Sequence, residues 1–137
     1  MTSDRGAVSS EFAVVMTVFL ASFMLLVVFA GRSTQAENDV RSAAHEAARA
    51  GSLANTPDAA RSAATQTALA NLAETGLSCA HGSRVDVATS NFEPGGTITV
   101  NVSCTASFGD LAALAVPGSR TFSSSATEVI DTYRASP

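Results

Sequence analysis

One carboxylate stands out near the start of the chain, because Glu11 lies at the edge of a long apolar run. The twenty residues that follow, from Phe12 to Gly31, carry no charge, and Thr17 and Ser22 are their only polar side chains. A carboxylate in a membrane segment costs up to ~3 kcal/mol when central and less near the interface, so Glu11 predicts a functional role. The alternative is an ordinary helix start, in which Glu11 and the two serines before it suit a first turn by capping and by the macrodipole.

The two cysteines, Cys79 and Cys104, both follow the apolar run. In a small domain outside the cytoplasm such a pair predicts a disulfide. Closing a loop of this length stabilises a fold by roughly 3.5 kcal/mol in the chain-entropy model, which matters for a small domain with few aromatic side chains. The alternative interpretation is a pair of unrelated buried thiols.

The other reactive side chains form no catalytic constellation. His45 falls within a predicted helix, and His81 falls in a predicted loop beside Cys79, which is too little for a zinc site. No serine sits in a nucleophile elbow, and Gly95-Gly96 lacks the following helix of a phosphate loop. The eight basic positions are all arginines scattered singly in a chain of net charge −4, which argues against nucleic-acid binding. We expect no enzymatic activity, no metal and no cofactor.

The apolar run from Phe12 to Gly31 is long enough to cross a bilayer, since about twenty helical residues span the ~30 Å hydrocarbon core. Three interpretations compete. The first is a cleaved secretory signal, released after Ala30 so that the mature chain starts at Gly31. The second is an uncleaved single-pass anchor for a head that binds an envelope partner. The third is the helix of a pilin-like subunit, and it depends on the residues just upstream.

The segment RGAVSSEFAVVMTVFL, which starts at Arg5, resembles the processing site of type IV pilin-like proteins. It is most similar to the TadE-like minor pilins, or pseudopilins, of tight-adherence pilus systems. A glycine, four residues, a glutamate and an aromatic residue precede a membrane-length run. Phe12 stands where fibre-forming pilins of this class often have tyrosine, which favours the pseudopilin branch.

The resemblance implies roles for four residues. A membrane-embedded prepilin peptidase would cut after Gly6, and Ala7 would become the new N-terminus. Glu11 and Phe12 would become mature positions five and six and serve assembly. The family's glutamate is thought to meet the free α-amino group of a neighbouring subunit, and pairing makes a buried carboxylate tolerable.

The residues after the apolar run predict a helical segment. No proline or turn cluster interrupts the chain before Thr56-Pro57, so we expect one helix from about residue 9 to residue 50, with Gly51 as its C-terminal stop. A second helix at about 57–75 has Thr56 as cap and Gly76 as its end. The first helix carries a thin apolar stripe that packs on its own head or on another helix: Ala36, Val40, Ala43, Ala44, Ala47 and Ala50. The predicted inward face of the second is Ala60, Ala64, Ala68, Leu69, Leu72 and Ala73.

The C-terminal half changes to a period of two, which is typical of half-buried strands. Residues 84–88 and 97–102 alternate polar and apolar side chains around the turn signal at 93–96, and predict an antiparallel hairpin. A third strand at about 120–130 completes a small sheet on the two helices. A helical turn is expected between Asp110 and Val116.

Together these observations predict an α+β fold: a long N-terminal transmembrane helix that continues outside the membrane, a second helix and a small C-terminal antiparallel sheet. The expected organisation is a leader at 1–6, a transmembrane helix at 7–31 and an extracytoplasmic head at 32–137, helical over 32–75 and mainly strands over 84–130. The N-terminus would face the cytoplasm. The expected partners are a prepilin peptidase, other pilin or pseudopilin subunits, pilus assembly proteins and membrane lipid. The expected location is the cell membrane, with incorporation into a surface pilus as the later state.

Overall fold

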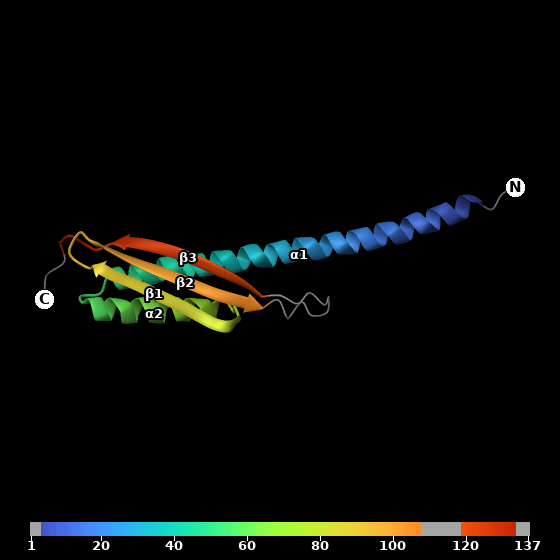
Figure 1. The fold of residues 1–137 in the computed structure, drawn as a ribbon. Coiled ribbons are helices and arrows are strands. Elements are labelled where there is room, and N and C mark those ends of the chain that lie inside the picture. The colour runs from blue at the N-terminus through green and yellow to red at the C-terminus, as the bar shows by residue number, and fades with distance from the viewer. Residues whose placement is uncertain (1–3, 108–118, 134–137) are drawn as a thin grey trace. The chain divides into compact units, whose positions relative to one another are not determined.

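The computed structural model describes the backbone of residues 4–107 and 119–133, and the side chains of residues 11–79, 82–106 and 119–133. The elements follow in the order α1 (Asp4–Ser52), α2 (Pro57–Glu74), β1 (Cys79–Asn91), β2 (Thr97–Ser107) and β3 (Ser119–Val129) (Figure 1). The chain forms two compact units, residues 1–35 and residues 36–137, and α1 contributes to both. The predicted α+β class is confirmed. The helical turn expected between Asp110 and Val116 lies outside the described residues.

Helix α1 begins five residues earlier than the sequence predicted, at Asp4 in place of about residue 9. Ser9 and Ser10 therefore occupy helical positions and do not cap a helix start. At its other end α1 reaches Ser52, close to the expected end near residue 50. Gly51 is not the predicted stop, because it lies inside the helix and is not among the glycines with a positive φ.

Gly51 serves close packing instead. A Cβ atom placed on it would lie 2.5 Å from Cδ1 of Ile98, 3.3 Å from the backbone oxygen of Ala60 and 3.4 Å from Cβ of Ala64. These atoms belong to α2 and β2, so the missing side chain lets the end of α1 approach both elements. Glycine has an unfavourable helix propensity, but this position requires it, because any larger residue would force the neighbouring atoms to shift.

Helix α2 starts and ends as its sequence predicts. The Thr56 side chain accepts a hydrogen bond from the Ala59 backbone N–H at 3.2 Å, and Pro57 occupies the first turn, where its missing N–H costs nothing. Gly76 follows the helix with φ of 71°, the left-handed conformation that glycine adopts most easily.

The core of the head is built mainly from alanines on the helices. The stripe of α1 packs within its own head, as one of the two interpretations predicted, but Ala48 is buried and Ala50 only half-buried. On α2 the buried residues follow a spacing of four, so Leu69 and Ala73, which we predicted to face inward, are exposed one position round the helix. The buried helical residues are Ala36, Val40, Ala43, Ala44, Ala47, Ala48, Ala60, Ala64, Ala68 and Leu72.

Three antiparallel strands in the order β1-β2-β3 cover this helical layer. The predicted hairpin is confirmed: the Gly96 N–H donates to the Glu93 carbonyl at 2.8 Å, and Gly95 has φ of 78°. The strands are longer than predicted, and β1 starts at Cys79, so the backbone of His81 lies in a strand and not in a loop. Alternate strand residues complete the core: Ile98, Val100, Val102, Cys104 and Ala106 from β2, and Phe122 and Ala126 from β3.

The predicted disulfide joins the first two strands. Cys79 and Cys104 are bonded, with Cα atoms 5.3 Å apart and a sequence separation of 25. The pairing of β1 and β2 shifts between Cys79 and Ser83, which places Ser83, and not Cys79, opposite Cys104. The bond therefore fixes the irregular first part of β1, where the ladder of backbone hydrogen bonds is interrupted.

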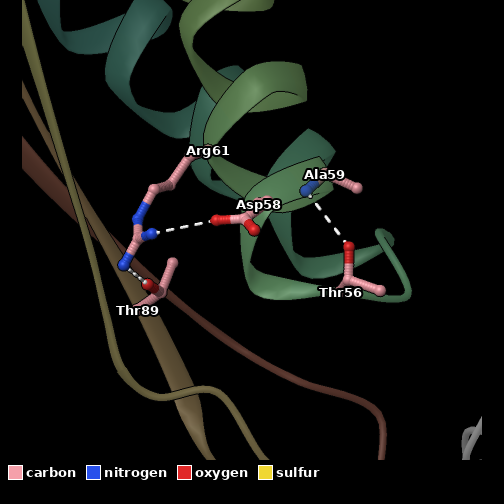
Figure 2. A network of polar contacts seen from close by, with 5 residues as sticks. All are labelled: Thr56, Asp58, Ala59, Arg61 and Thr89. Carbon is pink, nitrogen blue, oxygen red and sulfur yellow. Dashed lines mark hydrogen bonds and ion pairs between the residues drawn. The ribbon is translucent and has the colours of Figure 1, made fainter.

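Arg61 connects α2 to β1, as Figure 2 shows. Its Nη2 atom donates to Oγ1 of Thr89 at 2.6 Å, while Nη1 lies 3.2 Å from Oδ1 of Asp58. Thr89 is the buried polar side chain of the described core, with 8% of its surface exposed, whereas the Asp58 side chain is 94% exposed. The hydrogen bond to Thr89 therefore contributes more to the stability of the head than the ion pair with Asp58, because a buried hydroxyl needs a partner and an exposed ion pair contributes little.

We predict that Arg61→Met destabilises the head by about 1–3 kcal/mol, because it leaves the Thr89 hydroxyl buried without a partner while keeping most of the aliphatic stem. Urea unfolding of the detergent-solubilised chain, followed by circular dichroism, measures the change. The matched control is Asp58→Asn, which should cost much less. Adding Thr89→Val to Arg61→Met should recover stability, and equal losses for Arg61→Met and Asp58→Asn would contradict the assignment.

Replacing both Cys79 and Cys104 by alanine should lower the free energy of unfolding of the head by about 3.5 kcal/mol, the chain-entropy estimate for a closed loop of this separation. The same urea titration gives the value, with Ser78→Ala as control beside the bridge. An unchanged unfolding midpoint would show that the bond contributes nothing to the fold.

Candidate functional site

The apolar part of α1 is uncovered in the first unit. Every side chain from Glu11 to Arg32 is exposed, including Phe12 at 64% and Leu26 at 64%. Burial begins at Ala36, where the second unit starts. The same helix therefore has two environments: its later residues pack on the head, and its earlier residues have no cover in the described chain.

This uncovered segment has the properties of a membrane-spanning helix. It is the one helix among the described residues that is long and apolar enough to cross a bilayer, so it could anchor the chain in a membrane. Its two hydroxyls bond within the helix: Oγ1 of Thr17 donates to the Ala13 carbonyl at 2.8 Å, and Oγ of Ser22 to the Val18 carbonyl at 2.9 Å. No hydroxyl of the segment therefore needs water as a partner.

Glu11 lies two helical turns after the first residue of α1. The effect of the helix macrodipole falls off within the first turn, so this position does not support the interpretation of Glu11 as a first-turn acid. Its side chain is exposed, and it is the only ionisable group between Glu11 and Gly31. The carboxylate is therefore free to meet a cation from another molecule.

Glu11 and Phe12 point to different faces of the helix, since successive residues differ by about 100°. Phe12, Met16, Phe19 and Phe23 follow a spacing of four, three and four, so they form one bulky face. Glu11 shares its own face with Val18 and Ser22, at seven and eleven residues further on. A neighbouring helix that pairs with the carboxylate thus contacts mainly small and branched side chains near Glu11, while Phe12, Phe19 and Phe23 face another direction. Phe29, five helical turns further on, returns to the face of Glu11.

The two residues of the predicted processing site lie in the first turns of α1. Gly6 and Ala7 are helical by backbone, and their side chains are outside the described set. Ala7 and Glu11 are four residues apart, which places them one turn apart on the same side of the helix. These predicted site residues lie near one another only because they share helix α1. In the described structure no residue from another element contacts them.

The head contains chemistry that sequence reasoning missed. The contact of Arg61 with Thr89 joins residues 28 positions apart, and no local pattern signals it. His45 is exposed on α1, and no group of three His, Cys, Asp or Glu side chains suited to a metal occurs among the described residues. The strongest candidate for function is therefore the exposed N-terminal helix.

Comparison with protein families supports that choice. Residues 6–49 match the family described as TadE-like protein, so the match covers 44 of the 137 residues and begins at Gly6. The resemblance stated from the sequence is confirmed over this segment, and it relates the chain to pilus components of the tight-adherence type. No curated protein and no solved structure matches the chain.

Proposed function

Since its residues 6–49 are a TadE-like segment, we propose that this chain is a non-enzymatic minor pilin or pseudopilin of a tight-adherence-type pilus or of its assembly machine. A prepilin peptidase removes residues 1–6, and the mature chain begins at Ala7. The subunit then joins its neighbours through the helix that follows. The observation that carries the proposal is the coincidence of that match with a fully exposed, membrane-length helix that has a single carboxylate at its edge.

Before assembly the subunit is held in the membrane by its apolar helix. Residues 12–31 expose apolar surface that lipid covers before assembly and neighbouring helices cover afterwards. Because lipid and a helix bundle are similarly apolar, transfer between them changes the free energy little. Packing and polar pairing then decide whether the subunit stays in the assembly.

Glu11 supplies the polar pairing in this proposal. Cleavage after Gly6 creates a positively charged α-amino group on Ala7, and this group of one subunit pairs with the Glu11 carboxylate of the next. A buried carboxylate is strongly unfavourable alone and tolerable when paired, so the pair selects the register in which both charges are satisfied. The bulky face with Phe12 contributes apolar packing to a different neighbour or to lipid.

The head lies outside the cytoplasm in this proposal. The disulfide between Cys79 and Cys104 supports that side, because such bonds persist in oxidising compartments. The cytoplasmic N-terminus gives the peptidase access to Gly6. The partners are accordingly the peptidase, other pilin or pseudopilin subunits, pilus assembly proteins and lipid. Two rival functions stay as outcomes of the experiment below: an uncleaved anchor, and a secreted protein released after Ala30.

We predict that the membrane-extracted protein starts at Ala7 and that Gly6→Leu abolishes this cut, because a peptidase pocket that accepts glycine excludes a branched side chain. Mass spectrometry of the intact chain gives the N-terminal residue. The matched control is Gly31→Leu, a second glycine in the same helix with nothing within 4 Å of an added Cβ, which should be processed normally. An intact N-terminus in the parent chain would favour the anchor, and a start at Gly31 would favour the secreted protein.

Glu11→Gln should be cleaved and inserted normally yet co-purify with its pilus partners at least about tenfold less, because breaking a buried charge pair costs several kcal/mol. Quantitative immunoblotting of the purified pilus or assembly fraction, relative to total membranes, provides the measurement. Glu37→Gln is the control, since Glu37 is an exposed glutamate of the same helix beyond the apolar run. Equal recovery of both variants would remove Glu11 from assembly.

A further inference from the structure

The sheet has a second face that the helices do not cover. Because strand residues alternate, the side chains between the core positions point away from α1 and α2, and they are exposed or half-buried. On β2 and β3 they are almost all short and polar. The short polar ones include Thr97, Thr99, Asn101, Ser103 and Thr105 on β2, and Thr121, Ser123, Ser125 and Thr127 on β3, while Val129 is an exposed apolar residue at the end of β3.

A shallow depression lies in the middle of this outer face. The strand register brings two rows of side chains across all three strands: Arg84, Ser103 and Ser123 in one, and Asp86, Asn101 and Ser125 in the other. All six residues line the depression, together with Val102 and Ser124, whose side chains point to the opposite side of the sheet. We call these six residues the polar rows.

The polar rows differ from their neighbours in being unpaired. On one side Thr99 and Thr127 share a hydrogen bond of 2.8 Å between their hydroxyls, and on the other side Thr105 and Thr121 do the same. Within the described structure none of the six polar-row side chains makes a hydrogen bond or an ion pair, although Arg84 and Asp86 lie two residues apart. Donors and acceptors of both kinds are thus available to a ligand.

The chemistry of these groups fits a polyhydroxylated ligand. The Asp86 carboxylate accepts, the Arg84 guanidinium donates, and the Asn101 amide and the serine hydroxyls do both. Adjacent sugar hydroxyls offer the same mixture of donors and acceptors at close spacing. One positive and one negative charge balance each other, which favours a neutral ligand over a phosphate or a uronic acid.

We propose that the polar rows bind a neutral sugar unit of an oligosaccharide. The same observations disfavour a protein partner, because the centre of a protein interface is enriched in aromatic and other large apolar side chains. Among the described residues that line this depression none is aromatic, and Val102 is the only apolar one. The absence of an aromatic ring for stacking on the sugar makes the single-site affinity weak, with a dissociation constant on the order of 1 mM. This inference is independent of the proposed pilus function.

The test is a titration of the full-length, isotope-labelled chain followed by amide chemical shifts. The protein is held in amine-oxide micelles, because maltoside or glucoside detergents carry sugar head groups that would compete. The probes are maltotriose, cellobiose, lactose, mannobiose and chitobiose, and inorganic phosphate tests for an anion. We expect saturable shifts with at least one sugar, largest at the polar rows and absent from the buried helical residues.

Variants locate the binding. The double variant Asp86→Ala with Asn101→Ala should weaken sugar binding at least about tenfold, since it removes charge-assisted and amide hydrogen bonds. Both residues are exposed, so the fold should survive. The control is Thr99→Ala with Thr127→Ala, an adjacent pair of the same face, which should bind as the parent chain does.

Several outcomes would overturn the proposal. These are no saturable shift with any of the sugars, sugar binding that the Asp86 and Asn101 variant leaves intact, or stronger binding of phosphate than of every sugar. Loss of self-association in that variant without sugar binding in the parent chain would identify the polar rows as a protein contact. Because processing is measured separately at Gly6, failure here leaves the pilus proposal unaffected.

Discussion

The apolar side chains between Phe12 and Gly31 are exposed along a helix that has no cover in the described chain. Each large one that is buried gains about 1.5–3 kcal/mol relative to water, so the segment as a whole cannot remain in water at equilibrium. Lipid and a bundle of similar helices both satisfy this requirement, and the family match fits a protein that exchanges one for the other. In the proposed assembly the single carboxylate of Glu11, at the edge of that apolar surface, provides the specificity that apolar contacts lack.

In the head, the C-terminal part of the same helix is covered by protein, because it packs on α2 and the sheet. From Ala36 onward α1 buries mainly alanines in a core shared with the alanines of α2, and the missing side chain of Gly51 lets the end of α1 pack closely on α2 and β2. Small side chains bury little area each, so such a core gains less from the hydrophobic effect than one built from leucine. The Cys79–Cys104 bond and the buried contact of Arg61 with Thr89 supplement this core by fixing β1 to its two neighbours.

Local sequence signals predicted much of this arrangement. The uncharged run gave the membrane-length helix, Thr56-Pro57 gave the start of α2, and alternation around residues 93–96 gave the hairpin. Two predictions were wrong in position. The serines before Glu11 suggested a helix cap, but α1 starts earlier, at Asp4. Leu69 was predicted to face inward, but α2 buries every fourth residue and leaves Leu69 exposed. The polar rows were beyond prediction, because they exist only once the register of three strands is known.

The division of α1 between two units also has a mechanical consequence. This helix is the only covalent connection between the N-terminal segment and the head, so a pull on the segment reaches the head through Ala36 and the residues after it. The alanine contacts of α1 with α2 and the sheet then carry the load. The disulfide lies further along the chain and joins β1 to β2, so no covalent cross-link fastens α1 to the sheet. The attachment of α1 to the rest of the head under traction thus depends on the noncovalent contacts of the small-residue core.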